Sequence, residues 1–317
     1  MNKSPQEDSS VTDAILHCGT MACKTIAVFG ATGAQGGSVA RALLKCPGFS
    51  VRAVTREVSR PAAIALKNLG AQVVKGDLDD KEAVEQILKG VYGAFLVTNF
   101  HTCKDKEVTQ GKLVADLAGT LGLKHVVYSG LENVNKMTGG ALRVAHFDTK
   151  GEVEEYFWEK GVPMTSVRMA FYFENFLTDL KPVKNASGEY DLVLPMEGVP
   201  MDGMAVADIG PVVCSLFQSP DGYIGKAIGL SAERLTAEQY AEKFSKHTGE
   251  KIKASKISTD EYSKLGFPNA EAFANMYQFY QMKPDRDIKL THQLYPKVKN
   301  FDQFLTENKD VLKNLLK

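Results

Sequence analysis

The sequence predicts an α/β fold, a Rossmann-type doubly wound parallel sheet with a smaller α+β C-terminal portion. One observation is the alternation of apolar and amphipathic segments through the first half of the chain. Repeated βα units of this kind build a parallel sheet that helices cover on both faces. The other is a glycine-rich stretch, Gly30 to Gly36, between the first apolar segment and an amphipathic one. Strand, glycine turn and helix in that order form the phosphate-binding unit of a dinucleotide-binding fold.

Apolar runs predict six strands in this part of the chain, over residues 25–29, 51–55, 71–75, 91–98, 125–129 and 164–169. Helical patterns lie between them, over residues 36–45, 59–69, 80–88, 108–121 and 151–160. The pattern then loosens to a turn at 185–188, a strand at 190–194 and helices over 208–217, 236–247 and 301–315. Asp208 directly precedes an apolar helical pattern, so we expect it to be a helix N-cap.

The chain has 317 residues, more than one hydrophobic core usually holds. We therefore expect a dinucleotide-binding Rossmann domain over residues 23–180 and a smaller α+β domain over 181–317, with some elements interleaved with the Rossmann sheet. Residues 1–22 are polar and are expected to form a poorly ordered extension. The sequence leaves open whether Met1 or Met21 starts the protein.

Composition disfavours several classes of partner. Lys plus Arg equals Asp plus Glu, 38 against 38, so no basic field attracts nucleic acid or an anionic membrane. Five cysteines without a C-x-x-C pair are typical of free thiols in a reducing compartment. His101 and Cys103 share a loop without further ligands, so we expect no metal site. Without a bilayer-length apolar run or a secretory signal, we expect a cytoplasmic protein, with the nucleus as an additional location.

The glycines have distinct physical roles in the expected turn. One permits the tight turn, the next lets the backbone approach a pyrophosphate, and the last lets helix and strand pack closely. The following helix N-terminus offers unpaired N–H groups and a partial positive charge to the anion. The spacing, G-x-x-G-x-x-G, favours the turn of short-chain dehydrogenases over the classical Rossmann turn.

The end of the second strand indicates which nicotinamide cofactor binds. A carboxylate there would bind the ribose hydroxyls, whereas a cation pairs with a 2′-phosphate. Arg56 stands at that position and Arg60 follows one turn later, so NADP(H) is favoured. Glu57 could instead neutralise Arg56. Asp77 also lies at a carboxyl end of a strand, where it is either a ligand contact or a turn residue.

Four segments together resemble the NmrA-like family of atypical short-chain dehydrogenases. They are Gly-Ala-Thr-Gly-Ala-Gln-Gly-Gly-Ser-Val-Ala (30–40), Val-Thr-Arg (54–56), Tyr-Ser-Gly-Leu-Glu-Asn (128–133) and His-Phe-Asp-Thr-Lys-Gly-Glu-Val-Glu-Glu-Tyr (146–156). The resemblance covers almost all residues from about 22 onward. It implies a Rossmann fold that binds NADP(H) and serves as an NADPH sensor.

The same resemblance implies a set of cofactor contacts. The pyrophosphate would lie on Gly30, Ala31, Thr32, Gly33, Ala34 and Gln35, the 2′-phosphate on Arg56 and Arg60, and the adenine on Asp77 and Leu78. The middle of the cofactor would lie on Thr98, Asn99 and Phe100, and its nicotinamide end on Lys150, Tyr172, Phe173, Glu174 and Asn175. The family lysine after the fourth strand aligns with Thr109, so that contact is not expected.

The catalytic apparatus of the short-chain dehydrogenases is degenerate in this chain. Their Tyr-x-x-x-Lys pattern reads His146-x-x-x-Lys150, and a neutral imidazole is a weak proton source beside a lysine. Hydride transfer to a carbonyl needs a proton for the developing alkoxide, and Ser129 alone cannot supply it. We therefore assign no catalytic residue and expect a protein that is not an enzyme, although weak activity stays open.

Two functions remain. One is a regulatory NADP(H)-binding redox sensor, a homodimer that couples the NADPH level to its oligomeric state and to protein partners whose identity the sequence does not give. The other is an NADPH-dependent reductase of quinones, enones or other carbonyl compounds, which accept hydride with less demand for a dedicated acid.

Overall fold

The computed structural model describes residues 23–100 and 106–316. Its centre is a seven-stranded sheet in the order β11-β6-β5-β4-β1-β2-β3, and every neighbouring pair is parallel. The strands are β1 (Lys24–Val28), β2 (Phe49–Thr55), β3 (Gln72–Lys75), β4 (Gly93–Leu96), β5 (His125–Tyr128), β6 (Met164–Arg168) and β11 (Ala227–Gly229). The strand order reverses between β1 and β4, which confirms the predicted doubly wound, Rossmann-type sheet.

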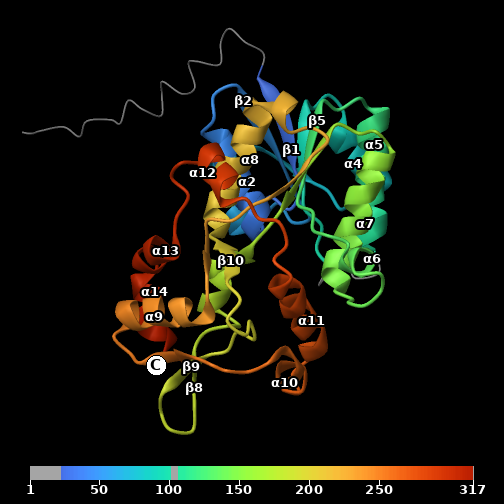
Figure 1. Ribbon diagram of the computed structural model, residues 1–317. Coiled ribbons are helices and arrows are strands. Elements are labelled where there is room, and N and C mark those ends of the chain that lie inside the picture. The colour runs from blue at the N-terminus through green and yellow to red at the C-terminus, as the bar shows by residue number, and fades with distance from the viewer. Residues whose placement is uncertain (1–22, 101–105, 317) are drawn as a thin grey trace, which may run out of the picture.

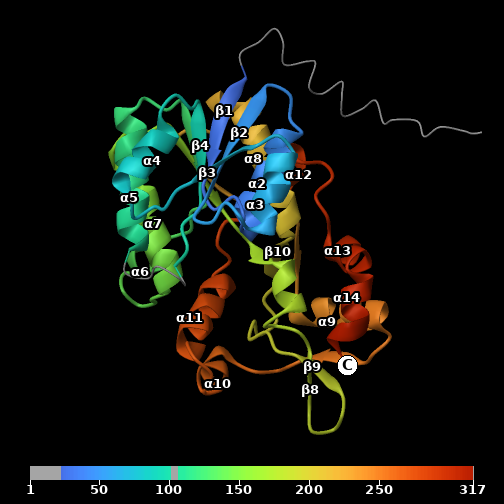
Figure 2. The same ribbon diagram turned by 180° about the vertical axis from the view of Figure 1, so that it is seen from behind.

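Helices cover both faces of this sheet (Figures 1 and 2). On one face lie α4 (Lys81–Leu88), α5 (Glu107–Thr120) and α7 (Ala145–Glu159); on the other lie α2 (Ala34–Leu44), α3 (Pro61–Asn68), α8 (Ile209–Gln218) and α12 (Ile288–Leu294). A buried apolar cluster fills each interface. Strands β4 and β5 are buried throughout, as expected for strands between two helical layers.

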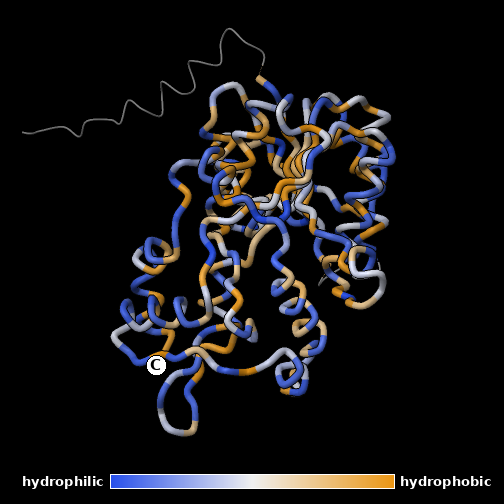
Figure 3. The backbone as a smooth tube through the Cα atoms, in the orientation of Figure 1, coloured by the Kyte–Doolittle hydropathy of each residue, from blue (hydrophilic) through white to orange (hydrophobic). Residues whose placement is uncertain are grey.

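The rest of the chain forms a smaller mixed portion below the sheet in Figure 1. It holds two three-stranded sheets, β12-β10-β7 and β13-β9-β8. Their strands are β7 (Phe171–Tyr172), β8 (Val183–Lys184), β9 (Tyr190–Leu192), β10 (Met201–Met204), β12 (Glu233–Leu235) and β13 (Ile252–Ala254). The helices are α9 (Ala237–Thr248), α10 (Thr259–Ser263), α11 (Ala270–Gln281), α13 (Phe301–Glu307) and α14 (Lys309–Leu315). Apolar residues concentrate in the strands of the large sheet (Figure 3).

The two portions are interleaved along the chain. Strand β11 pairs with β6 in the large sheet, α8 packs against α2, and α12 packs against α8, although all three lie beyond residue 181. No independent observation tests the boundaries 23–180 and 181–317, which stay a prediction. The predicted extension 1–22, and with it the choice between Met1 and Met21, lies outside the described residues.

Two local predictions need correction. The helix expected over 301–315 is two helices, α13 and α14, which meet at Asn308. Asp208 does occupy the N-cap position of α8, but its side chain makes no capping hydrogen bond. Instead its carboxylate accepts the backbone N–H of Lys299 at 2.8 Å. A contact across the fold therefore replaces the local one.

Candidate functional site

The glycine turn between β1 and α2 has the geometry of a phosphate cradle. Gly30 has φ +64°, a conformation that glycine adopts without strain, and its carbonyl accepts the N–H of Gly33 at 2.9 Å. A Cβ at Gly36 would lie 2.3 Å from the carbonyl oxygen of Gly30, so a side chain there would displace the backbone of the turn. Gly30, Gly33 and Ala34 are exposed, so the turn is open to a ligand.

The N-terminus of α2 is free of competing anions. Its N-cap is Gly33, which has no side chain, and its first turn contains no acidic residue. The amide of Gln35 donates to the hydroxyl of Tyr172 at 2.7 Å, while its own Oε1 is buried without a hydrogen-bond partner among the described residues. Exposed N–H groups and a partial positive charge suit a diphosphate at this helix end.

Arg56 and Arg60 stand exposed beyond the end of β2. Within the described residues, neither forms an ion pair. Glu57 accepts the hydroxyl of Ser59 at 2.6 Å, and the hydrogen bonds from Ser59, aided by the charges of Arg60 and Lys75, lower the pKa of this carboxyl. Glu57 therefore does not neutralise Arg56, and both guanidinium groups are available to a 2′-phosphate.

The loop after β3 is organised around two aspartates. Asp77 accepts the backbone N–H of Asp79 at 3.1 Å, which is a local turn contact, and Leu78 is partly buried against the core. Asp79 accepts Lys106 at 2.8 Å and Gln110 at 2.9 Å, and these hydrogen bonds lower its pKa. Asp79 thus ties this loop to the start of α5, a role that the sequence analysis did not identify.

Lys150 is fully engaged by protein groups. Its ammonium donates to the carbonyl of Thr98 at 2.8 Å, to the hydroxyl of Thr98 at 3.0 Å and to Glu107 Oε1 at 2.7 Å. An ammonium has three N–H donors, so each of them has an acceptor. Glu107 is fully buried, and its second oxygen accepts the hydroxyl of Thr149. The predicted ribose contact of Lys150 therefore requires it to give up one of these bonds.

The surroundings of Lys150 also shift its pKa. Burial lowers the pKa of Lys150, and the charge and hydrogen bond of Glu107 oppose that shift. Glu107 carries no signal in the sequence, because a Glu in the first turn of a helix is ordinary on the helix-dipole argument alone. Its burial beside Lys150 becomes evident only when α5 and α7 pack together.

His146 lies among aromatic rings at the start of α7. Its ring centroid is 5.0 Å from Phe147, 6.0 Å from Phe100 and 6.5 Å from Phe273. Ser129, the third member of the degenerate catalytic set, follows β5 and is buried. His146 also lines a cavity of about 790 Å³, which eight Phe and Tyr rings dominate: Phe147, Phe171, Tyr172, Tyr262, Phe267, Phe273, Tyr277 and Tyr280.

The run of four residues 172–175, which is expected at the nicotinamide end together with Lys150, has side chains that point in different directions. Tyr172 and Asn175 line the cavity. Phe173 is fully buried against the rings of Tyr240, Phe301 and Phe304. The carboxylate of Glu174 accepts the N–H of Val206 at 2.9 Å. Only Tyr172 and Asn175 thus present side chains to the cavity, and the predicted cofactor contacts at all four positions stay untested, as do those of Asn99 and Phe100.

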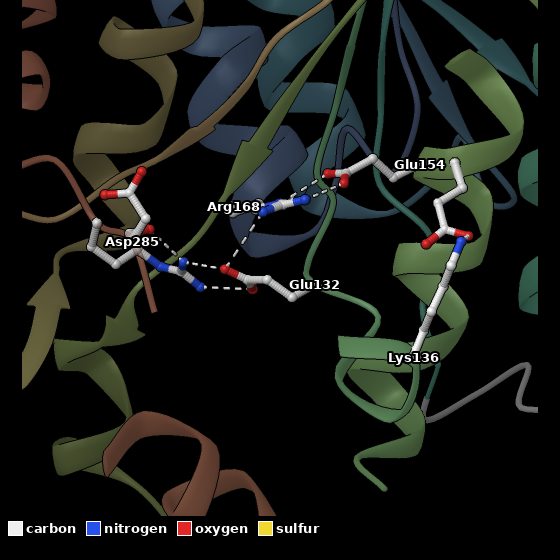
Figure 4. Close-up of polar contacts among 7 residues, drawn as sticks. Glu132, Lys136, Glu154, Arg168 and Asp285 are labelled. Carbon is white, nitrogen blue, oxygen red and sulfur yellow. Dashed lines mark hydrogen bonds and ion pairs between the residues drawn. The ribbon is translucent and has the colours of Figure 1, made fainter. Parts of the chain in front are cut away.

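A second buried charge site lies one turn further along α7, where two arginines and two glutamates form a network (Figure 4). Arg286, in the connection between α11 and α12, makes a two-pronged contact with Glu132, one bond of which measures 3.1 Å. Arg168 pairs with Glu154 and lies 3.9 Å from Glu132. The network joins the C-terminal portion to β6, α7 and the loop after β5.

The two glutamates of this network differ in acidity. Burial raises the pKa of the Glu132 carboxyl, but hydrogen bonds and charge from Arg286, with the charge of Arg168, bring that pKa below its ordinary value. Burial also raises the pKa of Glu154. Arg168 and the side chain of Ser166 lower it, but less than burial and the charge of Glu132 raise it, so the pKa of Glu154 stays raised. Glu132 is thus the better-stabilised anion.

Two other kinds of site are absent from the residues that the structure describes. In the part of the chain that the structure describes, no helix is both long and apolar enough to cross a bilayer. Across residues 23–100 and 106–316 there is also no group of three His, Cys, Asp or Glu side chains placed to bind a metal ion.

Comparisons with solved structures agree on the fold. NmrA, described as a negative transcriptional regulator and solved with NADP, superimposes with a TM-score of 0.79 at 21% identity, over 93% of this chain and 98% of that one. An NADPH-dependent quinone oxidoreductase from Escherichia coli, solved with NADPH, gives 0.74 at 21% identity, over 89% of this chain and 98% of that one.

Sequence comparisons identify the family. An NmrA-like family domain-containing protein of Dictyostelium discoideum is 33% identical over 294 residues, 89% of this chain and 97% of that protein. NmrA-like family domain-containing protein 1 of Rattus norvegicus is 30% identical over 90% of this chain and 96% of its own length. An NmrA-like family domain-containing oxidoreductase of Cladobotryum is 32% identical over 81% of this chain and 83% of its own length. With the family model matching residues 22–305, the chain belongs to the NmrA-like family.

Proposed function

We propose that this protein is an NADP(H)-binding regulator, whose cofactor occupancy is coupled to its oligomeric state and to the binding of protein partners. The observation that carries the proposal is an open dinucleotide cradle beside a lysine whose three donors are all in use. The cradle supports binding, and the engaged lysine argues against a catalytic dyad.

The residues of the site fit the phosphorylated cofactor. The N-terminus of α2 and the glycine turn would hold the diphosphate, and Arg56 with Arg60 would hold the 2′-phosphate. When bound, the nicotinamide ring supplies a hydride donor or acceptor. The chain would contribute Lys150 and His146 at that end, and the three N–H donors of Lys150 are already bonded to protein oxygens.

Coupling requires that the cofactor favour one conformation over another. Release of Lys150 from Glu107 is the conformational difference that the site offers, since the 2′- and 3′-hydroxyls of a ribose and the Glu107 carboxylate would compete for the same ammonium. The solved NmrA with NADP is described as a transcriptional regulator, which supports a regulatory role. We further propose a homodimer acting in the cytoplasm and the nucleus.

The test is a titration of NADPH, NADP⁺ and NADH, with light scattering to follow the oligomeric state. We expect NADPH and NADP⁺ to bind more tightly than NADH and to change the dimer fraction, with no turnover across a panel of carbonyls and quinones. Arg56→Gln should remove most of the preference for the phosphorylated cofactors, and Lys67→Gln, in the exposed last turn of α3, is the matched control. Steady oxidation of NADPH by any member of the panel would overturn the proposal.

The cavity of about 790 Å³ favours a second candidate, an NADPH-dependent reductase. Its ring-lined wall suits a planar apolar acceptor such as a quinone or an enone. An oxidoreductase relative and the solved quinone oxidoreductase support this alternative. The reductase would be favoured over the regulator by NADPH consumption that saturates with the acceptor. Phe273→Ala should then reduce this consumption without weakening NADPH binding.

A further inference from the structure

Two thiols lie where the C-terminal end of α2 meets α8, away from the cradle at the N-terminus of α2. Cys46 follows the C-terminal end of α2 and is partly buried, and Cys214 lies in α8 and is buried. Both are free cysteines. Cys23, in contrast, is disulfide-bonded, which corrects the expectation that all five cysteines are free thiols. The pair belongs to neither the cofactor site nor the aromatic cavity.

Helices α2 and α8 are packed tightly against each other at a point away from the two cysteines, near Ser38 and Gly210. A Cβ at Gly210 would lie 2.2 Å from the backbone oxygen of Ser38, so the helices touch backbone to backbone there. The N–H of Gly210 donates to the Ser38 hydroxyl at 3.0 Å, and that hydroxyl donates to the carbonyl of Ala207 at 2.9 Å. Such close packing leaves little freedom for α2 and α8 to slide.

Cys46 lies against the face of α8 that carries Cys214. Its sulfur accepts the side-chain amide of Gln218 at 3.0 Å, and Gln218 is one helical turn after Cys214 on the same face. Burial raises the pKa of the Cys214 thiol, and a hydrogen bond with the Cys46 side chain adds to that shift. Cys46 therefore lies next to the stretch of α8 that carries Cys214 in the reduced protein.

We propose that Cys46 and Cys214 form a reversible intramolecular disulfide on exposure to peroxide. The partly exposed Cys46 reacts first: its thiolate sulfur attacks one peroxide oxygen, the O–O bond breaks, and a sulfenic acid forms with loss of water. The Cys214 sulfur then attacks the Cys46 sulfur, the S–O bond breaks, and a second water leaves. Two thiols are oxidised and one hydrogen peroxide is reduced to two waters.

The modification would join the cradle helix covalently to a helix from the second half of the chain. Because α2 begins directly after Gly33, the crosslink would limit any rearrangement of α2 that accompanies cofactor binding. The proposal does not depend on the proposed function, since its readout is the covalent state of the two residues.

The experiment uses the full chain, reduced, desalted and treated with stoichiometric hydrogen peroxide, then blocked with iodoacetamide and digested with trypsin. We expect peptide 46–52 linked to peptide 185–226, two hydrogens lighter than their sum and separated again by dithiothreitol. Recovery of both peptides with alkylated cysteines, or of Cys46 as sulfinic acid, would overturn the proposal.

The variant Cys214→Ala tests whether Cys46 reacts first, and its melting temperature shows whether the variant is folded. Cys214→Ala should unfold thermally at the same temperature as the reduced wild type and should accumulate Cys46 sulfenic acid, which dimedone traps. Peroxide should raise the melting temperature of the wild type and leave that of the variant unchanged. Equal dimedone labelling of wild type and variant would contradict the role of Cys214 as the resolving thiol.

Discussion

Two buried charge sites lie one turn apart on α7 and differ in construction. Lys150 meets a single carboxylate, Glu107, and completes its contacts with neutral oxygens of Thr98 at 2.8 and 3.0 Å. Glu154, four residues later, belongs to the network of two guanidinium groups and two carboxylates in Figure 4. The first site borders the predicted cofactor loop, and the second joins the two portions of the fold.

The difference suits the two sites to different tasks. An ammonium is a point charge on a flexible stem, so it changes acceptors at little cost in geometry. A guanidinium is a rigid fork, and Arg286 uses its fork on Glu132 while also donating to the backbone carbonyl of Met169 at 3.2 Å. We infer that Lys150 can exchange its hydrogen-bond acceptors, and that the arginine network holds the two portions of the fold together.

The largest effect is expected from breaking the arginine network. Arg286→Met leaves Glu132 buried next to a single, more distant guanidinium, and removing one partner of a buried ion pair typically costs about 3–5 kcal/mol. Urea denaturation measures the loss. Lys136→Met, which removes an exposed ion pair with Glu155, is the matched control and should stay within about 0.5 kcal/mol of wild type. A loss below about 1 kcal/mol for Arg286→Met would contradict this role of the network.

Mild acid should destabilise the protein through His125. Burial lowers the pKa of this imidazole from 6.5 to about 4. Between pH 6.5 and about 4, the imidazole is therefore protonated in the unfolded chain but stays neutral in the folded protein. The free energy of unfolding falls as the pH drops through that range. From pH 7 to 5 the loss should reach about 2 kcal/mol.

His125→Gln isolates this contribution, because glutamine does not titrate and retains an amide able to reach the Thr165 hydroxyl, which the imidazole contacts at 2.8 Å. Urea denaturation at the two pH values should show a smaller difference for the variant than for the wild type. An unchanged difference would place the acid sensitivity elsewhere.

The features that could be predicted from the sequence are those that depend on residues close together in the chain. The cradle was predictable because Gly30 and Gly36 meet demands of the turn itself, namely a positive φ and a contact six residues away. The pairing of Lys150 with His146 on one helix was predictable from spacing. Glu107 and Arg286 were not, since each acquires its role from a partner 43 or 154 residues away. Nothing in their own neighbourhood distinguishes them from surface charges.

The lysine site should respond more gently than the arginine network. Glu107→Gln keeps an acceptor for Lys150 but removes the charge, and a hydrogen bond to a charged group exceeds a neutral one by about 1 kcal/mol. If a bound ribose competes for the ammonium, NADPH should bind about fivefold more tightly to the variant. Fluorescence titration checks this, with Glu152→Gln, which removes an exposed ion pair of α7, as the control. Weaker binding would mean that Lys150 must stay on Glu107 to shape the site.

The smallest effect is expected from restoring the missing phenol. In short-chain dehydrogenases the lysine lowers the pKa of the tyrosine, but here the ammonium of Lys150 already donates to three oxygens. His146→Tyr alone should therefore leave NADPH turnover on quinones and carbonyls at the wild-type level. The double variant His146→Tyr with Glu107→Gln weakens the bond that holds the lysine and should raise turnover above either single change. Activity gained by His146→Tyr alone would contradict this expectation. It would show that Lys150 leaves Glu107 readily and that the wild type lacks only the phenol for turnover.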